Sequence, residues 1–130
     1  MSSIFTKIIN GEIPSHKITE NDTFYAFLDI RPIAPGHTLV IPKVEIDLFF
    51  DLNNDILSHY LPFAKPIAKA IEKVVQCDRV GLMVAGLEVP HAHLHLVPIN
   101  GIGDLSFAHA QPETSDNLAI MAEKIKNQLK

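Results

Sequence analysis

The spacing of apolar positions divides the chain into short strand-like runs and longer helical runs. The strand-like runs occupy residues 17–20, 23–28, 38–41, 80–84 and 93–97. Helical spacing covers residues 4–9, 53–75 and about 114–129. Strands that follow one another along the chain, with one long helix between the third and fourth, predict an α+β fold. We expect an antiparallel five-stranded sheet with one long central helix and a C-terminal helix.

Turn residues and prolines punctuate this pattern. Asn21-Asp22 separates the first two strands and predicts a tight hairpin. Residues 29–36 are rich in Pro and Gly, which predicts a loop that leads into the third strand. Pro62 and Pro66 fall inside the long helical run and each removes a backbone donor, so we expect a kink or a late helix start. Thr114 or Ser115 is the candidate N-cap of the last helix.

Length and composition indicate an ordinary globular protein. The 130 residues fit a single domain spanning 1–130, with a core over about 4–99. Hydrophobic residues make up 47% and charged residues 20%, a balance that excludes the composition of disordered chains. The formal net charge is −4, and the sequence contains no block of Lys and Arg. We therefore expect no long nucleic acid as partner. A small anionic ligand remains open, because a few donors in one pocket can hold a phosphate.

The chain has one cysteine, Cys77, and therefore no internal disulfide. We expect this residue to be a small semi-buried side chain near a helix end. No segment approaches the roughly 18 apolar residues of a membrane span. These features predict a cytoplasmic protein without a membrane partner.

Three histidines alternate with apolar residues in His91-Ala-His93-Leu-His95. Side chains on a strand alternate between its faces, so the imidazoles share one face, about 6.6 Å apart at the backbone, while the apolar residues face the core. Three adjacent titratable groups cannot all be charged at low cost, which favours a functional origin. Imidazoles near neutral pH can act as nucleophile, acid, base or phosphate donor, or they can bind zinc or copper. His37 would supply a fourth metal ligand, so both chemistries stay open.

The run His91-Ala-His-Leu-His-Leu-Val97 resembles the signature of the histidine triad family, with seven consecutive positions in agreement. Two further segments are similar to family blocks: residues 3–14 at the opening, and residues 28–43, which read LDIRPIAPGHTLVIPK. The resemblance covers about residues 4–99 and is nearest to the branch of nucleoside phosphoramidate hydrolases. It implies an antiparallel sheet with two helices, extended across the interface of a homodimer.

The resemblance also implies a chemistry and assigns residues to it. Family members cleave purine nucleotide conjugates at the α-phosphorus through a nucleotidyl-histidine, without a cofactor. The catalytic positions would be His93 as nucleophile, His95 as phosphate donor, His91 as the residue that orients the nucleophile, and His37 as support. Asp29 matches the position that takes the ribose hydroxyls. The walls of the base pocket would be Ile4, Phe5, Ile8, Phe27 and Ile30.

The sequence departs from the family at two places. Ala85 stands where relatives carry Asn, and Glu88 stands where they carry a hydroxyl near the leaving group. A positioned general acid is worth roughly 10²- to 10⁴-fold in rate, so the change predicts a slow enzyme or another leaving group, unless a protonated Glu88 replaces the hydroxyl. Ser3 and Thr6 occupy the positions of a Cys pair that binds zinc in many bacterial relatives. Neither is a competent zinc ligand, so we expect no structural metal.

The sequence therefore predicts a homodimeric hydrolase of nucleoside 5'-phosphoramidates or related nucleotidyl conjugates. Two alternatives remain from other classes of protein. One is a weakly catalytic nucleotide-binding or regulatory protein, which the residues at positions 85 and 88 favour. The other is a metal-binding protein that uses the histidine strip.

Overall fold

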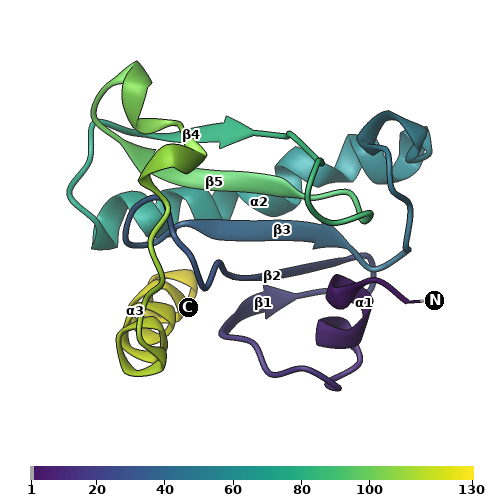
Figure 1. The fold of residues 1–130 in the computed structure, drawn as a ribbon, viewed down its shortest axis with the longest axis horizontal. Helices are drawn as coiled ribbons and strands as arrows, with labels where there is room; N and C mark the ends of the chain where they lie inside the picture. Colours follow the sequence, from purple (N-terminus) through teal and green to yellow (C-terminus); the bar gives the residue numbers. More distant parts are fainter. Residues whose placement is uncertain (1) are drawn as a thin grey trace.

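The computed structural model describes residues 2–130, and its elements follow the order expected from the sequence (Figure 1). The strands are β1 (Lys17–Glu20), β2 (Phe24–Leu28), β3 (Thr38–Pro42), β4 (Arg79–Met83) and β5 (Leu94–Ile99). The α-helices are α1 (Ile4–Ile9), α2 (Asn54–Val74) and α3 (Ser115–Leu129). Three short 3₁₀ turns, Phe49–Asp51, Ile102–Asp104 and Phe107–His109, complete the chain.

The five strands form one sheet in the order β1-β2-β3-β5-β4, and every neighbouring pair is antiparallel. The predicted α+β class and five-stranded sheet are confirmed. Asn21 closes the predicted hairpin between β1 and β2, because its side-chain oxygen accepts hydrogen bonds from the backbone of Thr23 and Phe24. Strands β1 and β4 are the two edges of the sheet.

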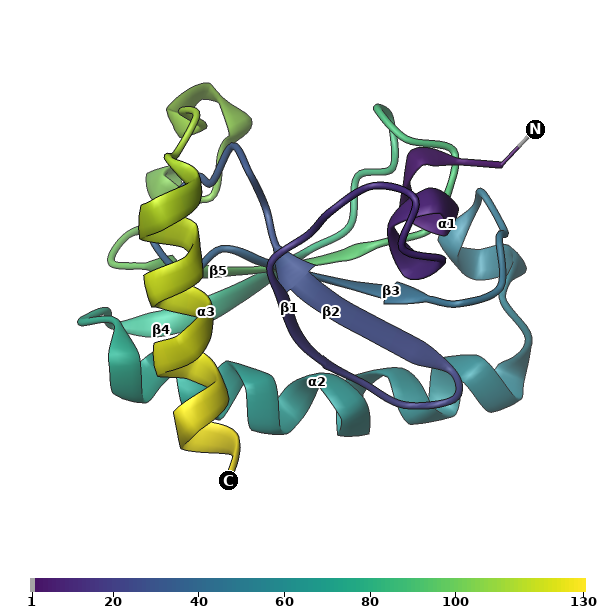
Figure 2. The same ribbon diagram turned by 90° about the horizontal axis from the view of Figure 1, so that it is seen from below.

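The two faces of the sheet have different partners. Along β2, Phe24, Ala26 and Leu28 belong to the core that α2 and α3 cover, whereas Tyr25 and Phe27 point to the side of α1. Figure 2 shows the sheet nearly edge-on, with α2 along one face and α1 on the opposite side. The apolar residues of the histidine run, Ala92, Leu94 and Leu96, join the α2 side as predicted. The histidines are therefore left for the face that carries α1.

Helix α2 runs without interruption through both of its prolines. Of the two effects predicted for the prolines, a kink or a late start, the late start is wrong, because the helix begins at Asn54, one residue after the Asn53 cap. Pro62 and Pro66 are one turn apart and both exposed, so the carbonyl groups that they leave unpaired face solvent. Leu61 has core spacing in the sequence but is 57% exposed in the structure.

One strand end differs slightly from the sequence prediction, and one of the two candidate N-caps of α3 is confirmed. Strand β5 begins at Leu94 and extends to Ile99, so His91 and His93 lie in the segment just before it. Thr114, not Ser115, caps α3 through its hydroxyl, which accepts from the backbone of Asn117. Cys77 is half-buried in the connection between α2 and β4, as expected.

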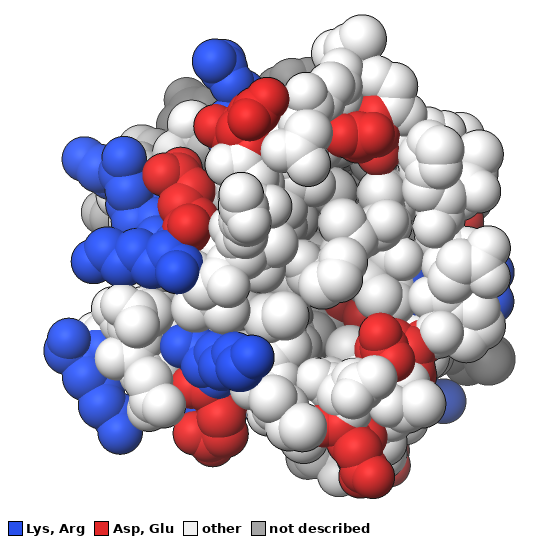
Figure 3. All heavy atoms as spheres, turned by 90° about the vertical axis from the view of Figure 1, so that its left-hand side faces the viewer, with Lys and Arg blue, Asp and Glu red and all other residues white. Residues whose placement is uncertain are grey.

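None of the helices in residues 2–130 combines the length and the apolar composition that crossing a membrane would need. A cytoplasmic location stays a prediction from the sequence. On the face drawn in Figure 3, Lys and Arg side chains lie beside acidic ones, and uncharged atoms fill much of the rest. This mixture agrees with the absence of a basic block in the sequence.

Candidate active site

Two of the histidines are held by backbone carbonyls. Nδ1 of His93 lies 2.7 Å from the carbonyl oxygen of His91, and Nε2 of His91 lies 2.7 Å from the carbonyl oxygen of Pro42. A carbonyl oxygen only accepts, so each of these ring nitrogens carries the proton. In the neutral form of His93 the lone pair is therefore on Nε2, the tautomer that a nucleophile requires.

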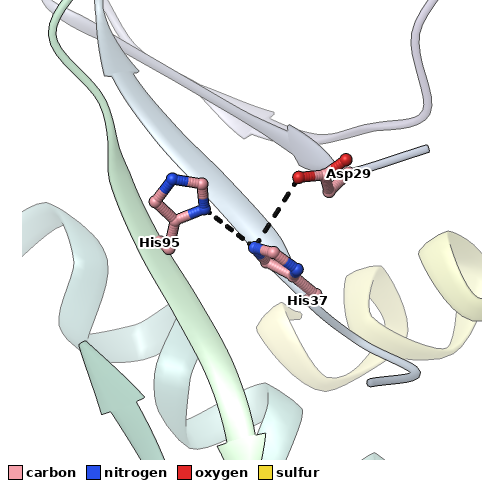
Figure 4. Close-up of side chains that lie close together, drawn as sticks. All are labelled: Asp29, His37 and His95. Atoms are coloured by element: carbon pink, nitrogen blue, oxygen red, sulfur yellow. Dashed lines mark hydrogen bonds and ion pairs between the residues drawn. The ribbon is translucent and has the colours of Figure 1, made fainter. Parts of the chain in front are cut away.

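His37 and His95 form a hydrogen-bonded pair, which Figure 4 shows together with Asp29. The backbone N–H of Ile33 donates to Nδ1 of His37 at 3.0 Å, so the proton of His37 is on Nε2. That Nε2–H lies 2.9 Å from Nδ1 of His95, which must accept it. The proton of His95 is consequently on its own Nε2. This atom is buried and has no hydrogen-bond partner in the described residues.

Burial keeps this pair uncharged at neutral pH. It lowers the pKa of His37 to about 4. The pKa of His95 falls to about 3, mainly through burial and further through repulsion from His37 and His93. His95 thus offers a neutral N–H donor without a partner. An unsatisfied buried donor costs free energy unless a ligand accepts from it, so the arrangement is suited to a ligand oxygen.

A second network ties α1 to His91. The Ser3 hydroxyl lies 2.8 Å from Nδ1 of His91 and also accepts from the backbone of Thr6, as the N-cap of α1. Glu45, from the loop after β3, accepts from the Ser3 backbone and from the Thr6 hydroxyl, both at 2.6 Å. Of the two residues at the positions of the relatives' Cys pair, Ser3 therefore binds His91 through its hydroxyl group, whereas the Thr6 hydroxyl donates to Glu45. Burial lowers the pKa of His91, so it too is neutral at pH 7.

Gly36 sets the position of His37. Its φ of +94° is in the left-handed region, and a Cβ at this position would come within 3.0 Å of the Val75 side chain. Only glycine allows the loop to turn this close to α2. The turn places the ring of His37 between His95 of β5 and Asp29, which follows β2, with Nε2 of His37 3.7 Å from a carboxylate oxygen of Asp29.

A cavity of about 390 Å³ opens in front of these rings. His93 and His95 line it, and so do Asp29 and all of the predicted base-pocket residues, namely Ile4, Phe5, Ile8, Phe27 and Ile30. His37 and His91 do not line this cavity. They form hydrogen bonds with the two histidines that do, His95 and His93. A cavity of this volume is within the range of small-molecule sites, with apolar walls and a few polar groups.

Electrostatics at Asp29 favour a neutral hydroxyl-bearing ligand. One carboxylate oxygen accepts from the Arg31 backbone at 2.9 Å, and the side chain is 21% exposed. Burial raises the pKa of Asp29, and the nearby charge of Glu88 raises it further. Glu88 is exposed and lines the same cavity, so the departure from the family lies at the rim of this cavity.

The sequence did not indicate every residue around the cavity. Phe107, from a 3₁₀ turn after β5, lines it and packs its ring 5.1 Å from that of His95. Phe5 packs edge-on against both His91 and His93, at 5.7 and 5.0 Å between ring centroids. Phe107 is an isolated aromatic residue in a segment with two glycines, and no local sequence pattern predicts its contact with His95.

One group of three side chains in the part of the chain that is described could approach a metal ion. Asp29, His37 and His95 each offer a ligand atom, all within 4.8 Å of one another (Figure 4). A metal on Nε2 of His37 would move its proton to Nδ1, against the N–H of Ile33. Two donors would then face each other in a buried position. The hydrogen bonds of this group thus disfavour the metal-binding alternative.

Comparison with known proteins places this geometry in a family. The model of the HIT domain family matches residues 10–101, which include the whole histidine run. The chain belongs to the HIT domain family. It is 43% identical to the adenosine 5'-monophosphoramidase HNT1 of Saccharomyces cerevisiae over 99 residues, which is 73% of this chain and 61% of the yeast protein. The yeast protein thus extends well beyond the matched part.

Other HIT relatives match over nearly the full length. The adenosine 5'-monophosphoramidase hnt1 of Schizosaccharomyces pombe is 33% identical over all of both chains. A HIT-like protein of Bartonella henselae superposes with a TM-score of 0.86 at 33% identity, covering 98% of this chain and 96% of the other. The HIT fold observed here is therefore shared from α1 to α3.

Proposed function

We propose that this HIT protein hydrolyses nucleoside 5'-phosphoramidates and related nucleotidyl conjugates through a covalent intermediate on His93. One observation carries the proposal: the hydrogen bond from Nδ1 of His93 to the His91 carbonyl, at the wall of a nucleotide-sized cavity. It leaves the Nε2 lone pair free for attack. The names of the yeast relatives support adenosine 5'-monophosphoramidate as a substrate.

In the first step, Nε2 of His93 forms a bond to the α-phosphorus and the bond from phosphorus to the leaving nitrogen breaks. The leaving amine takes up a proton from solvent, because the attacking ring keeps its own proton on Nδ1. The phosphorylated ring of His93 then carries a positive charge, which strengthens its hydrogen bond to the His91 carbonyl. This gain exists only once charge develops on the ring, so the contact stabilises the transition state more than the ground state.

His95 supplies the complementary donor. Its partnerless Nε2–H would bind a phosphoryl oxygen, where negative charge gathers as the bond forms. In the second step, water attacks phosphorus and gives up a proton to solvent, the electron pair of the broken bond returns to Nε2 of His93, and the nucleoside monophosphate leaves. Asp29 would accept the ribose hydroxyls, and the apolar walls would stack the base without reading its edges.

Rapid-quench mass spectrometry with adenosine 5'-monophosphoramidate tests this proposal. We expect a transient species heavier than the chain by one adenylyl group, mapping to His93, and release of AMP. Release of AMP without an adduct, or an adduct on another residue, would contradict the assigned nucleophile. Binding of AMP without any turnover would instead support the nucleotide-binding alternative, which the residues at positions 85 and 88 still favour.

We also propose that two copies of this chain pair through the free edge of β4. Leu82 of this strand is 49% exposed, and Leu61 of α2 is exposed beside it. Both line a groove of about 530 Å³ between helix and strand. An unpaired edge with exposed apolar side chains is a template for pairing, and a second β4 would continue the sheet.

Leu82→Lys should separate the two copies. A charge at this position would be buried in the paired state, at a cost of several kcal/mol for an unpaired ion. Light scattering at micromolar concentration should give a dimer for the wild type and a monomer for the variant. Ile120→Lys is the matched control, because Ile120 is 55% exposed but lies on α3, away from the groove. A monomeric wild type would refute the pairing.

A further inference from the structure

A second cavity, of about 580 Å³, meets the first one at His93, which lines both. It is built from the segment between β3 and α2 and from the segment that follows β4, and apart from His93 its lining residues are not those of the nucleotide cavity. A substrate with phosphorus in front of His93 would have its nucleoside in one cavity. The second cavity is then available to whatever else is bonded to that phosphorus.

The second cavity has apolar walls that are exposed to solvent. Phe50 is 88% exposed and Leu48 is 62% exposed, and both line it together with Val84. Phe50 does not belong to a loose loop. It sits in the 3₁₀ turn Phe49–Asp51, closed by two backbone hydrogen bonds, and the ring of Phe49 anchors this turn against Tyr60.

The charge around the second cavity is entirely negative. Asp47 and Asp51 line it, and no Lys or Arg does. Within residues 2–130, neither carboxylate has a cationic partner within 4.0 Å. Unneutralised carboxylates attract a cationic ligand group and repel an anionic one.

We propose that this second cavity binds the leaving group of the substrate and selects an amine with an apolar stem and a positive charge. The inference rests on the proposed function and names the class of leaving group that it left open. Leaving groups that carry phosphate or carboxylate are disfavoured by Asp47 and Asp51. The apolar stem lies against Phe50 and Leu48.

The chemistry limits this selection to the first step. Once the bond from phosphorus to nitrogen breaks, the protonated amine leaves and the adduct on His93 is the same for every substrate with one nucleoside. The second cavity therefore changes kcat/KM, which reports on events up to the first irreversible step. It does not change hydrolysis of the adduct.

A series of adenosine phosphoramidates tests the proposal. Their leaving amines share one alkyl chain that ends in an ammonium, a methyl or a carboxylate group, and unsubstituted adenosine 5'-monophosphoramidate is the reference. The wild type should show kcat/KM in the order ammonium, methyl, carboxylate. Phe50→Ala should lower the ratio of the methyl substrate to the reference about tenfold, the size of a modest apolar contact.

Charge is tested by the double variant Asp47→Asn/Asp51→Asn, which should reduce the ratio of ammonium to carboxylate substrate about tenfold. Leu87→Ala is the matched control, because Leu87 is 93% exposed but lines neither cavity, and all ratios should stay as in the wild type. Equal kcat/KM for the three chain ends, or ratios unmoved by the cavity variants, would overturn the proposal. Failure of the wild type to cleave the reference would overturn the proposed function, and this inference with it.

Discussion

His93→Ala should lower the turnover of adenosine 5'-monophosphoramidate by on the order of 10⁴-fold or more, the scale of losing a covalent nucleophile. Binding of AMP should change much less. The base-pocket walls and Asp29 come from other segments, so truncating His93 leaves them in place. Steady-state kinetics gives the first quantity and calorimetric titration with AMP gives the second.

His16→Ala is a suitable control for this experiment, because His16 lies outside both cavities and outside the histidine network. It should keep the wild-type rate. Near-normal turnover by His93→Ala would exclude His93 as the nucleophile. If AMP binding fell as much as turnover, the substitution would have disturbed the whole cavity. The role of His93 would then be decided by whether the wild-type protein forms the adenylyl adduct on this residue.

The sequence predicted the periodic part of this structure well. Alternation sent Ala92 and Leu94 to the helical core and left the histidines for the other face, because a strand has only two sides. The prolines of α2 were harder to judge. Their effect depends on whether the carbonyls that they release face solvent, and Pro62 and Pro66 are both exposed.

The exposure of Leu61 could not be predicted from a local sequence pattern either. Helical spacing says that apolar residues share a stripe, but it does not say where the covering sheet ends. Leu61 lines, together with Leu82 of the edge strand β4, the groove where the second copy is proposed.

The hydrogen bonds of the histidines join segments that are far apart in the sequence. Ser3 and His91 are separated by 88 positions, and His37 and His95 by 58. No periodicity links such pairs, and the resemblance assigned roles to the histidines without giving their protonation. The tautomers follow only from backbone groups, above all the N–H of Ile33, that the fold brings to the rings.

These hydrogen bonds lead to a second prediction with a large expected effect, for substitution of His37. His37→Leu should lower kcat about 10²-fold, the lower end of what losing one oxyanion donor costs. Without the Nε2–H of His37, Nδ1 of His95 loses its donor and can itself carry the proton. His95 would then spend part of its time in the tautomer that has no donor toward the phosphoryl oxygens. Affinity for AMP should fall less than kcat.

His37→Gln separates this role from mere packing. A Gln amide has an oxygen that can accept from Ile33 and an NH₂ group that can donate to His95, so it can reproduce both hydrogen bonds of the histidine. We expect His37→Gln to recover most of the lost kcat, with thermal unfolding confirming that both variants are folded. If the Leu and Gln variants have equal kcat, His37 contributes only volume to the site. The proton on Nε2 of His95 would then have to be fixed by the substrate itself, since no group in the described residues forms a hydrogen bond with that nitrogen.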